Sequence, residues 1–133
     1  MTTPLLAAAY VDTTALTPLV ADEEPVAASI RGKLERFRYL LSANLLEAEM
    51  RVVFAMEGRE FDDDVLSSVR WIMPNRRLDA EMAAVLRTAQ LQPVRLWHLA
   101  TALFFAELVP RLAFVTLDEQ QETAAQDLGL AIV

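Results

Sequence analysis

The chain has 133 residues, of which 54% are hydrophobic, 23% are charged and only 3 are glycine; this is enough for one globular domain and excludes a disordered, collagen-like or low-complexity chain. It contains no cysteine and one histidine, so disulfides, cysteine-bound zinc, iron–sulfur clusters, thiol catalysis and multi-histidine metal sites are excluded. The 12 basic and 19 acidic side chains give a formal net charge of −7, which excludes a general nucleic-acid coating protein unless divalent cations bridge carboxylates to phosphates.

The first third of the chain is predicted to form a strand and a helix. An apolar run over residues 6–11, ending at Asp12, is typical of a strand buried on both faces in a parallel sheet. The acidic stretch 22–24 before Pro25 indicates a helix start, and apolar spacing continues that helix through Phe37, over about four turns. Its outer face is predicted to carry four basic residues: Arg31, Lys33, Arg36 and Arg38.

The middle of the chain is predicted to be rich in helices. A short strand is expected over residues 39–42, and a helix over 45–56 that stops at Gly58. Three aspartates at 62–64 are expected to open another helix that runs to about residue 71, and 76–78 is a candidate edge strand.

The pattern in the last third of the chain predicts two helices, over residues 79–90 and 96–105, and then a strand over 112–117. A helix over 119–128 and a final strand over 130–133 are predicted to follow. Strands that alternate with helices predict an α/β fold with a mostly parallel sheet, in a single domain. The helix-rich middle makes α+β the competing fold class.

No membrane or targeting segment is expected. The N-terminal apolar run has no basic flank and is too short to span a bilayer. We therefore expect a cytoplasmic protein that does not act at a membrane.

Two aspartates follow the strongest strand candidates. Asp12 ends the run 6–11 and Asp118 ends the run 112–117, with Thr14 and Thr116 close by in the sequence. Open parallel sheets bind ligands beyond the carboxyl ends of their strands. Clustered carboxylates repel one another unless a hard cation such as Mg²⁺ or Mn²⁺ neutralises them. The simpler alternative is that each aspartate caps the helix that follows it.

Four segments together resemble a known family. Residues 9–16 (AYVDTTAL), 43–49 (ANLLEAE), 96–102 (LWHLATA) and 114–121 (FVTLDEQQ) resemble, in order, the motifs of PIN-domain ribonucleases, and most closely the VapC-type toxins of bacterial toxin–antitoxin pairs. Each motif is weak by itself, but the four occur in the expected order and at the expected spacing, from about Tyr10 to Val133.

The resemblance implies a three-layer α/β/α sandwich that cleaves RNA with Mg²⁺ or Mn²⁺ and is held in check by a VapB-like antitoxin. It also implies that three residues of this chain correspond to the metal-binding acids of the family: Asp12, Glu49 and Asp118. Glu49 fits the motif spacing better than Glu47, and Thr14 and Thr116 are expected as supporting hydroxyls.

One residue departs from the family pattern. The position three residues before His98, where the family places an acid, is Arg95. Because Arg95 replaces a negative charge by a positive one near the start of a helix, it removes a metal ligand and adds a competing cation. Its guanidinium is expected to pair with Asp12 or Asp118. We therefore expect weak metal binding and slow or absent RNA cleavage, which Arg95→Asp should restore.

Catalytic or metal-binding roles for two other features of the sequence have less support. His98 is a candidate general base, but its place among apolar residues of a helix favours packing. The aspartates at 62–64 are a candidate second metal site, but acids at a helix start need no such explanation.

Three functions therefore stand side by side. The first is a toxin endoribonuclease impaired at Arg95, and the second is a catalytically inactive PIN-like module that binds an antitoxin or RNA. The third is a small α/β binding protein unrelated to nucleases, in which alanine at Asp12 and Asp118 would abolish no activity. The mean hydropathy of +0.27 also predicts a buried interface, in a homodimer or a toxin–antitoxin hetero-oligomer.

Overall fold

A computed structural model describes residues 6–133, and its centre is a four-stranded sheet in the order β3-β2-β1-β4. All three strand pairs are parallel. The strands are β1 (Leu6–Val11), β2 (Phe37–Ala43), β3 (Val69–Ile72) and β4 (Ala113–Val115). The predicted α/β class with a parallel sheet is therefore confirmed.

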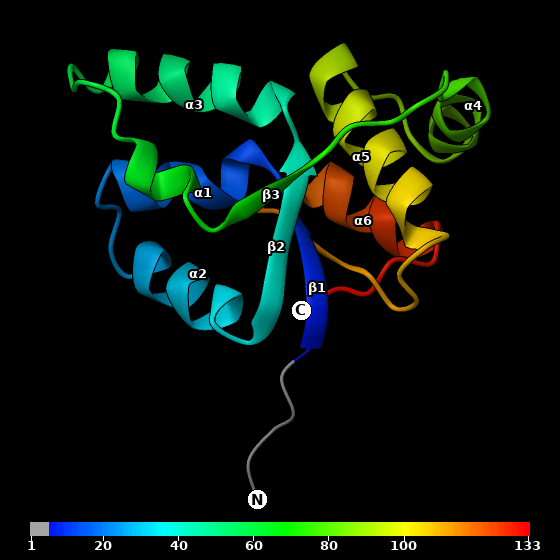
Figure 1. Ribbon diagram of the computed structural model, residues 1–133, viewed down its shortest axis with the longest axis horizontal. Helices are drawn as coiled ribbons and strands as arrows, with labels where there is room; N and C mark the ends of the chain where they lie inside the picture. Colours follow the sequence, from blue (N-terminus) through cyan, green and yellow to red (C-terminus); the bar gives the residue numbers. More distant parts are fainter. Residues whose placement is uncertain (1–5) are drawn as a thin grey trace, which may run out of the picture.

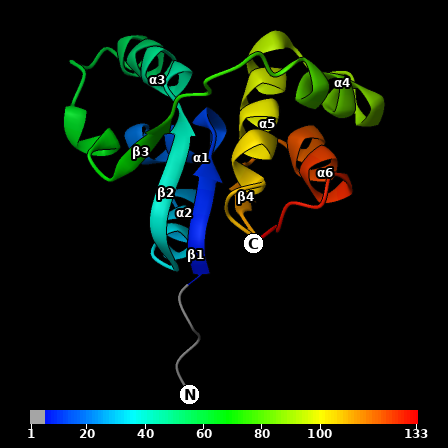
Figure 2. The ribbon, with the colours of Figure 1, turned by 45° about the vertical axis from the view of Figure 1, so that its right-hand side comes forward.

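Helices cover both faces of this sheet (Figure 1). They are α1 (Thr13–Val20), α2 (Val26–Leu34), α3 (Leu45–Met56), the short 3-10 helix η1 (Asp63–Leu66), α4 (Asp79–Thr88), α5 (Pro93–Ala106) and α6 (Glu119–Asp127). The first three α-helices lie on one side of the strands and the last three on the other, as the turned view in Figure 2 also shows. The result is a three-layer α/β/α sandwich.

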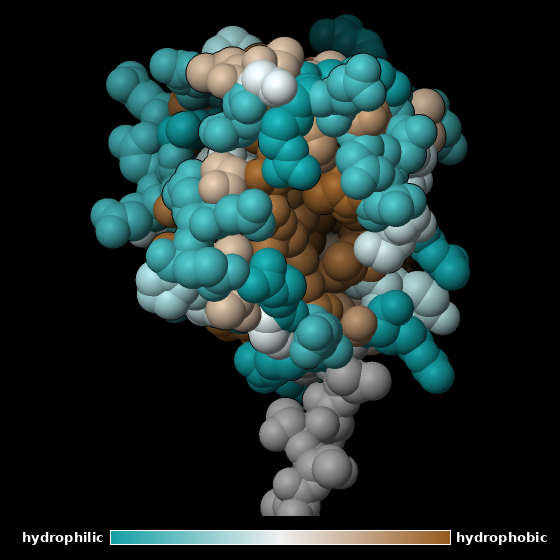
Figure 3. Space-filling model, turned by 90° about the vertical axis from the view of Figure 1, so that its left-hand side faces the viewer, coloured by the Kyte–Doolittle hydropathy of each residue, from teal (hydrophilic) through white to brown (hydrophobic). Residues whose placement is uncertain are grey.

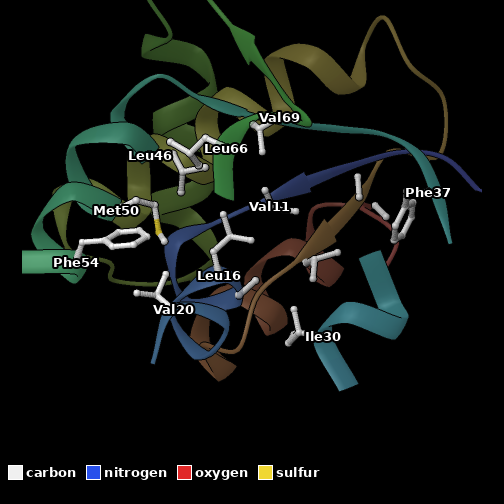
Figure 4. Close-up of a cluster of buried hydrophobic side chains, with 14 residues drawn as sticks. Val11, Leu16, Val20, Ile30, Phe37, Leu46, Met50, Phe54, Leu66 and Val69 are labelled. Atoms are coloured by element: carbon white, nitrogen blue, oxygen red, sulfur yellow. The ribbon is translucent and has the colours of Figure 1, made fainter. Parts of the chain in front are cut away.

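The alternation of side chains along β1 explains the two layers. Ala9 and Val11 point to one face and Ala8 and Tyr10 to the other, because successive side chains of a strand project in opposite directions. All four are buried, so β1 is covered on both sides and reads as a continuous apolar run. Figure 4 shows the buried hydrophobic side chains on the face of Ala9 and Val11, where Val11 lies among side chains of α1, α2 and α3.

The strand order places a switch point beside the central strand. From β1 the chain moves outward to β2 and β3, and then returns to add β4 on the other side of β1. Asp12 follows β1 and Asp118 follows β4 at the carboxyl edge. Open α/β sheets bind ligands at such a point, so both aspartates lie where a site is expected.

The helix predicted to run through Phe37 ends earlier. Helix α2 stops at Leu34, and Phe37 is the first residue of β2, where it pairs with Leu6 of β1. The helical spacing of Phe37 was coincidental, because the ring is buried through the sheet pairing. Arg36 and Arg38 therefore lie outside the helix, and the predicted basic helix face does not form.

The helix predicted from the three aspartates is also wrong. The side chain of Asp62 accepts a hydrogen bond from the Asp64 amide and starts only η1, a single short turn. The segment Val69–Ile72 then joins β2 as the edge strand β3. Its β-branched and aromatic residues suit a pleated strand, and pairing with β2 outweighs the helical signal of the acids.

Two short predicted strands do not form. Residues 76–78 are not a strand, and Arg76 instead donates hydrogen bonds to Glu81 in the first turn of α4. The segment 130–133 makes only one isolated bridge, between Ala131 and Ala113. Gly129, with φ at +89°, turns the chain away from the end of α6.

None of the helices between residues 6 and 133 combines the length and apolar character needed to cross a lipid bilayer. The first five residues of the predicted N-terminal apolar run lie outside the described residues.

Candidate functional site

A cavity of about 310 Å³ opens at the carboxyl edge of the sheet. Helices α1, α3, α5 and α6 each contribute side chains to it. The polar residues that line it include Asp12, Thr14, Glu49, Arg95, His98 and Gln121. Segments from distant parts of the sequence therefore meet here.

Asp12 is the most buried carboxylate of this cavity, with 1% of its surface exposed. It caps α1, because its Oδ1 accepts a hydrogen bond from the Ala15 amide at 3.1 Å. The hydroxyl of Thr14 donates to Oδ1 and that of Thr116 to Oδ2, both at 2.7 Å. Burial raises the pKa of the Asp12 carboxyl above its ordinary value, although these hydrogen bonds act in the opposite direction.

The two supporting threonines join the ends of β1 and β4. Thr14 accepts a hydrogen bond from the Leu117 amide at 2.8 Å, and Thr116 accepts one from the Asp118 amide at 3.0 Å. Their hydroxyl oxygens lie 3.0 Å apart. The expected hydroxyls thus contact Asp12 and also hold the loop that carries Asp118.

Arg95 forms an ion pair with Asp118. Its guanidinium Nη1 meets Oδ2 of Asp118, and the other oxygen of that carboxylate caps α6 by accepting from the Gln121 amide at 2.9 Å. The Asp118 side chain is 11% exposed and that of Arg95 42% exposed. The sequence predicts that Arg95 pairs with Asp12 or with Asp118, and in the structure the partner is Asp118.

Glu49 enters the cavity and Glu47 does not. The carboxylate of Glu49 lies 2.6 Å from Nε2 of His98, whereas Glu47 is exposed and binds Arg51 at 3.2 Å on the surface of α3. The side chains of residues that lie two positions apart on a helix project in different directions, so only one of the two acids faces the sheet. The preference for Glu49 over Glu47 agrees with this geometry.

Behind Glu49, His98 contacts a buried tyrosine. His98 is 1% exposed, and its Nδ1 lies 2.6 Å from the hydroxyl of Tyr10. Tyr10 is fully buried and stacks on Phe114, with ring centroids 5.3 Å apart. Burial raises the pKa of the Tyr10 hydroxyl, so the phenol keeps its proton.

The residue types suit a hard divalent cation, but their arrangement does not fit one. Both oxygens of Asp12 accept hydrogen bonds, Glu49 contacts His98, and Asp118 is paired with Arg95. Across the described part of the chain, no three acidic or histidine side chains are grouped as ligands of a single metal ion. The cation of this site is the guanidinium of Arg95.

Sequence reasoning did not identify every polar residue of the site. The apolar pattern of residues 6–11 does not single out Tyr10, and the fourth motif does not single out Gln121, yet both side chains are fully buried. Gln121 donates from Nε2 to the backbone oxygen of Arg95 at 3.4 Å and so joins α6 to the start of α5. A tyrosine in a strand buried on both faces was the available signal, because a buried hydroxyl requires a partner.

Comparisons with models of protein families, with curated proteins and with solved structures found no match. The resemblance to PIN-domain toxins therefore stays a prediction from the four sequence motifs.

Proposed function

We propose that this chain is a toxin-type endoribonuclease domain of the PIN class whose metal-dependent cleavage is suppressed by Arg95. The observation that carries the proposal is the placement of the three acids. Asp12 and Glu49 line one cavity at the switch point of the sheet, and Asp118 lies beside it, paired with Arg95. The four motifs supply the prediction of RNA as substrate and of Mg²⁺ or Mn²⁺ as cofactor.

Arg95 accounts for the suppression by charge. The three carboxylates carry three negative charges and Arg95 one positive charge, whereas an aspartate at position 95 would give four negative charges. A change of two charge units within one partly buried site alters cation binding strongly. Arg95 therefore replaces a potential ligand and also occupies another one, Asp118.

The test is RNA cleavage by the native chain, by Arg95→Asp and by a matched control, Arg95→Gln. Gln removes the guanidinium without adding a carboxylate, so it separates competition by the cation from loss of a ligand. We expect Mg²⁺-dependent cleavage by Arg95→Asp, with little or none by the native chain and an intermediate rate for Arg95→Gln. Equal rates for the native chain and Arg95→Asp would refute the role given to Arg95.

The ion pair itself favours a second candidate function. Because Arg95 neutralises the acidic edge without a metal ion, the native chain is also suited to act as an inactive PIN-like module that binds an antitoxin or RNA. RNA or antitoxin binding without cleavage, both by the native chain and by Arg95→Asp, would favour this second function.

A hollow on another face supports the proposal of a protein partner. A groove of about 410 Å³ runs between α1, α2, η1 and the sheet, and its apolar lining includes Leu16, Leu19 and Phe37. Figure 3 shows this face hollowed, with hydrophobic side chains in the hollow and polar ones around it. Arg31, Glu35 and Arg38 also line the groove, and Arg31 is paired with Glu24, which leaves Arg38 as the basic residue that a partner can meet. Its chemistry suits an apolar antitoxin segment with an acidic residue opposite Arg38.

Charge reversal at the groove tests this partner. Arg38→Glu should weaken binding of the co-expressed antitoxin about tenfold, because it puts a like charge opposite that acidic residue. Arg36→Glu is the matched control, since Arg36 is exposed nearby but does not line the groove. Binding constants of the three purified proteins measure the effect, and equal affinities would exclude this docking site.

A further inference from the structure

A continuous polar chain leads from the core of the sandwich to the cavity. It begins at the Ala43 amide, which donates to the hydroxyl oxygen of Tyr10 at 3.1 Å. It continues from that hydroxyl to Nδ1 of His98 and from Nε2 of His98 to Oε1 of Glu49, each over 2.6 Å. Tyr10 and His98 are both buried, whereas Glu49 lies at the cavity.

With a neutral imidazole beside the Glu49 carboxylate, one arrangement of donors satisfies every contact of this chain. The Tyr10 oxygen accepts the proton of the Ala43 amide, and the hydroxyl lies within hydrogen-bond distance of Nδ1 of His98, which can accept the hydroxyl proton. If the hydroxyl donates to Nδ1, a neutral imidazole carries its ring proton on Nε2. From there it is donated to the Glu49 carboxylate. A neutral ring protonated on Nδ1 would leave Nε2 with nothing to donate to Glu49.

The packing around His98 fixes the orientation of its ring. Tyr10 meets it edge-on at 5.6 Å between centroids, and Phe114 stacks behind Tyr10. His98 also lies one helical turn after Arg95, so α5 presents both residues to the same cavity. The same helix therefore places the cation beside Asp118 and the imidazole beside Glu49.

We propose that Tyr10 and His98 are positioning residues: Tyr10 holds His98 in the Nε2-protonated form, and His98 in turn orients the Glu49 carboxylate toward the cavity. The consequence for activity rests on the function proposed above, whereas the form of the imidazole does not. Outer partners of this kind tune a site because they fix the direction in which a ligand presents its oxygens.

The chain has only one histidine, which makes the first test direct. Nitrogen NMR of the native chain, labelled with ¹⁵N in the imidazole and measured at pH 7, reports the state of each ring nitrogen. We expect a protonated Nε2 and an unprotonated Nδ1. A ring protonated on Nδ1, or on both nitrogens, would overturn the proposal.

The second test removes the Tyr10 hydroxyl. Tyr10→Phe keeps the stacked ring but should convert the single form of His98 into a mixture of the two neutral forms. Tyr39→Phe is the matched control, because Tyr39 is the only other tyrosine and is 39% exposed, outside the cavity. An unchanged His98 spectrum in a folded Tyr10→Phe variant would contradict the role of Tyr10.

The third test connects the polar chain to the site. In the Arg95→Asp variant, addition of Tyr10→Phe should weaken Mn²⁺ binding about tenfold, whereas addition of Tyr39→Phe should not. Equal Mn²⁺ affinities for the two double variants would show that Tyr10 does not position Glu49. If Arg95→Asp binds no Mn²⁺, the proposed function fails, and the NMR spectrum of the native chain still decides the protonation of His98.

Discussion

At the scale of single residues, Arg95 is the feature that most changes the chemistry of the site. It occupies the first turn of α5, where the helix dipole disfavours a cation, and Asp118 compensates by direct pairing. The sequence marks Arg95 as unusual at the start of a helix, but it does not determine which acid pairs with Arg95. Asp12 and Asp118 are both carboxylates that follow a strand, so the sequence gives no reason to prefer one of them. The hydrogen bonds already made to Asp12 by the two threonines explain the outcome.

The contact between Tyr10 and His98 could not be predicted from the sequence. The two residues are 88 positions apart, and they meet only because Tyr10 faces the α5 side of the sheet. Which face a strand residue takes depends on its register, and a slip of one residue would have sent Tyr10 to the other layer.

Asp12 provides a test of the electrostatic description at this scale. Its raised pKa means that the folded chain binds the Asp12 proton more tightly than the unfolded chain does, so ionisation of Asp12 lowers the free energy of unfolding as the pH rises from about 3.8. Asn at this position keeps an oxygen for the Ala15 amide and carries no charge. We expect Asp12→Asn to raise the melting temperature at pH 7 and to abolish cleavage in the Arg95→Asp background.

The matched control for this substitution is Asp127→Asn, because Asp127 is exposed at the end of α6. It should leave both the melting temperature and the cleavage rate unchanged. A melting temperature of Asp12→Asn below that of the native chain at pH 7 would show that the charge of Asp12 stabilises the fold.

At the scale of elements, apolar runs bounded by turn residues were predicted well. Strand β1 and helix α3 have the predicted bounds, because burial on both faces and a terminating Gly58 leave clear patterns. The errors occurred where a partner strand decides the structure. The segment that became β3 and the first residue of β2 owe their conformation to pairing across the sheet, which local spacing does not report.

An ion pair joins the first turn of α4 to the residues before it, and the sequence did not predict it. Arg76 binds Glu81 through both guanidinium Nη atoms and lies over the ring of Phe104, 5.1 Å from its centroid. The hydrogen bonds from Arg76 lower the pKa of Glu81. The stabilisation is therefore fully present above the ordinary pKa of 4.5 and is lost as the pH falls through the lowered pKa.

Substitution of Glu81 measures this contribution. Because the Arg76 side chain is 44% exposed, solvent screens the pair, and Glu81→Gln should cost only about 1 kcal/mol of unfolding free energy at pH 7. Urea unfolding of both proteins at pH 7 and below the lowered pKa checks the result. A cost that persists undiminished at low pH would assign the effect to packing on Phe104.

At the scale of the whole molecule, the three-layer sandwich and its parallel sheet could be predicted because strands and helices alternate along the chain. The convergence of residues near positions 12, 49 and 118 followed from the same topology, since parallel strands end at one edge. The partners of these carboxylates could not be predicted, because they come from helices whose packing angle and rotation the sequence pattern leaves open. The structure adds that every one of the three acids already has a partner in the protein.

The central claim is that the guanidinium of Arg95 takes the place of a metal ion at Asp118. Calorimetric titration of Mn²⁺ into the native chain and into Arg95→Asp tests it most directly, because it measures cation binding without any assumption about the RNA substrate. We predict saturable binding to Arg95→Asp and none, or binding at least tenfold weaker, to the native chain. Equal Mn²⁺ affinity of the two proteins would contradict the claim.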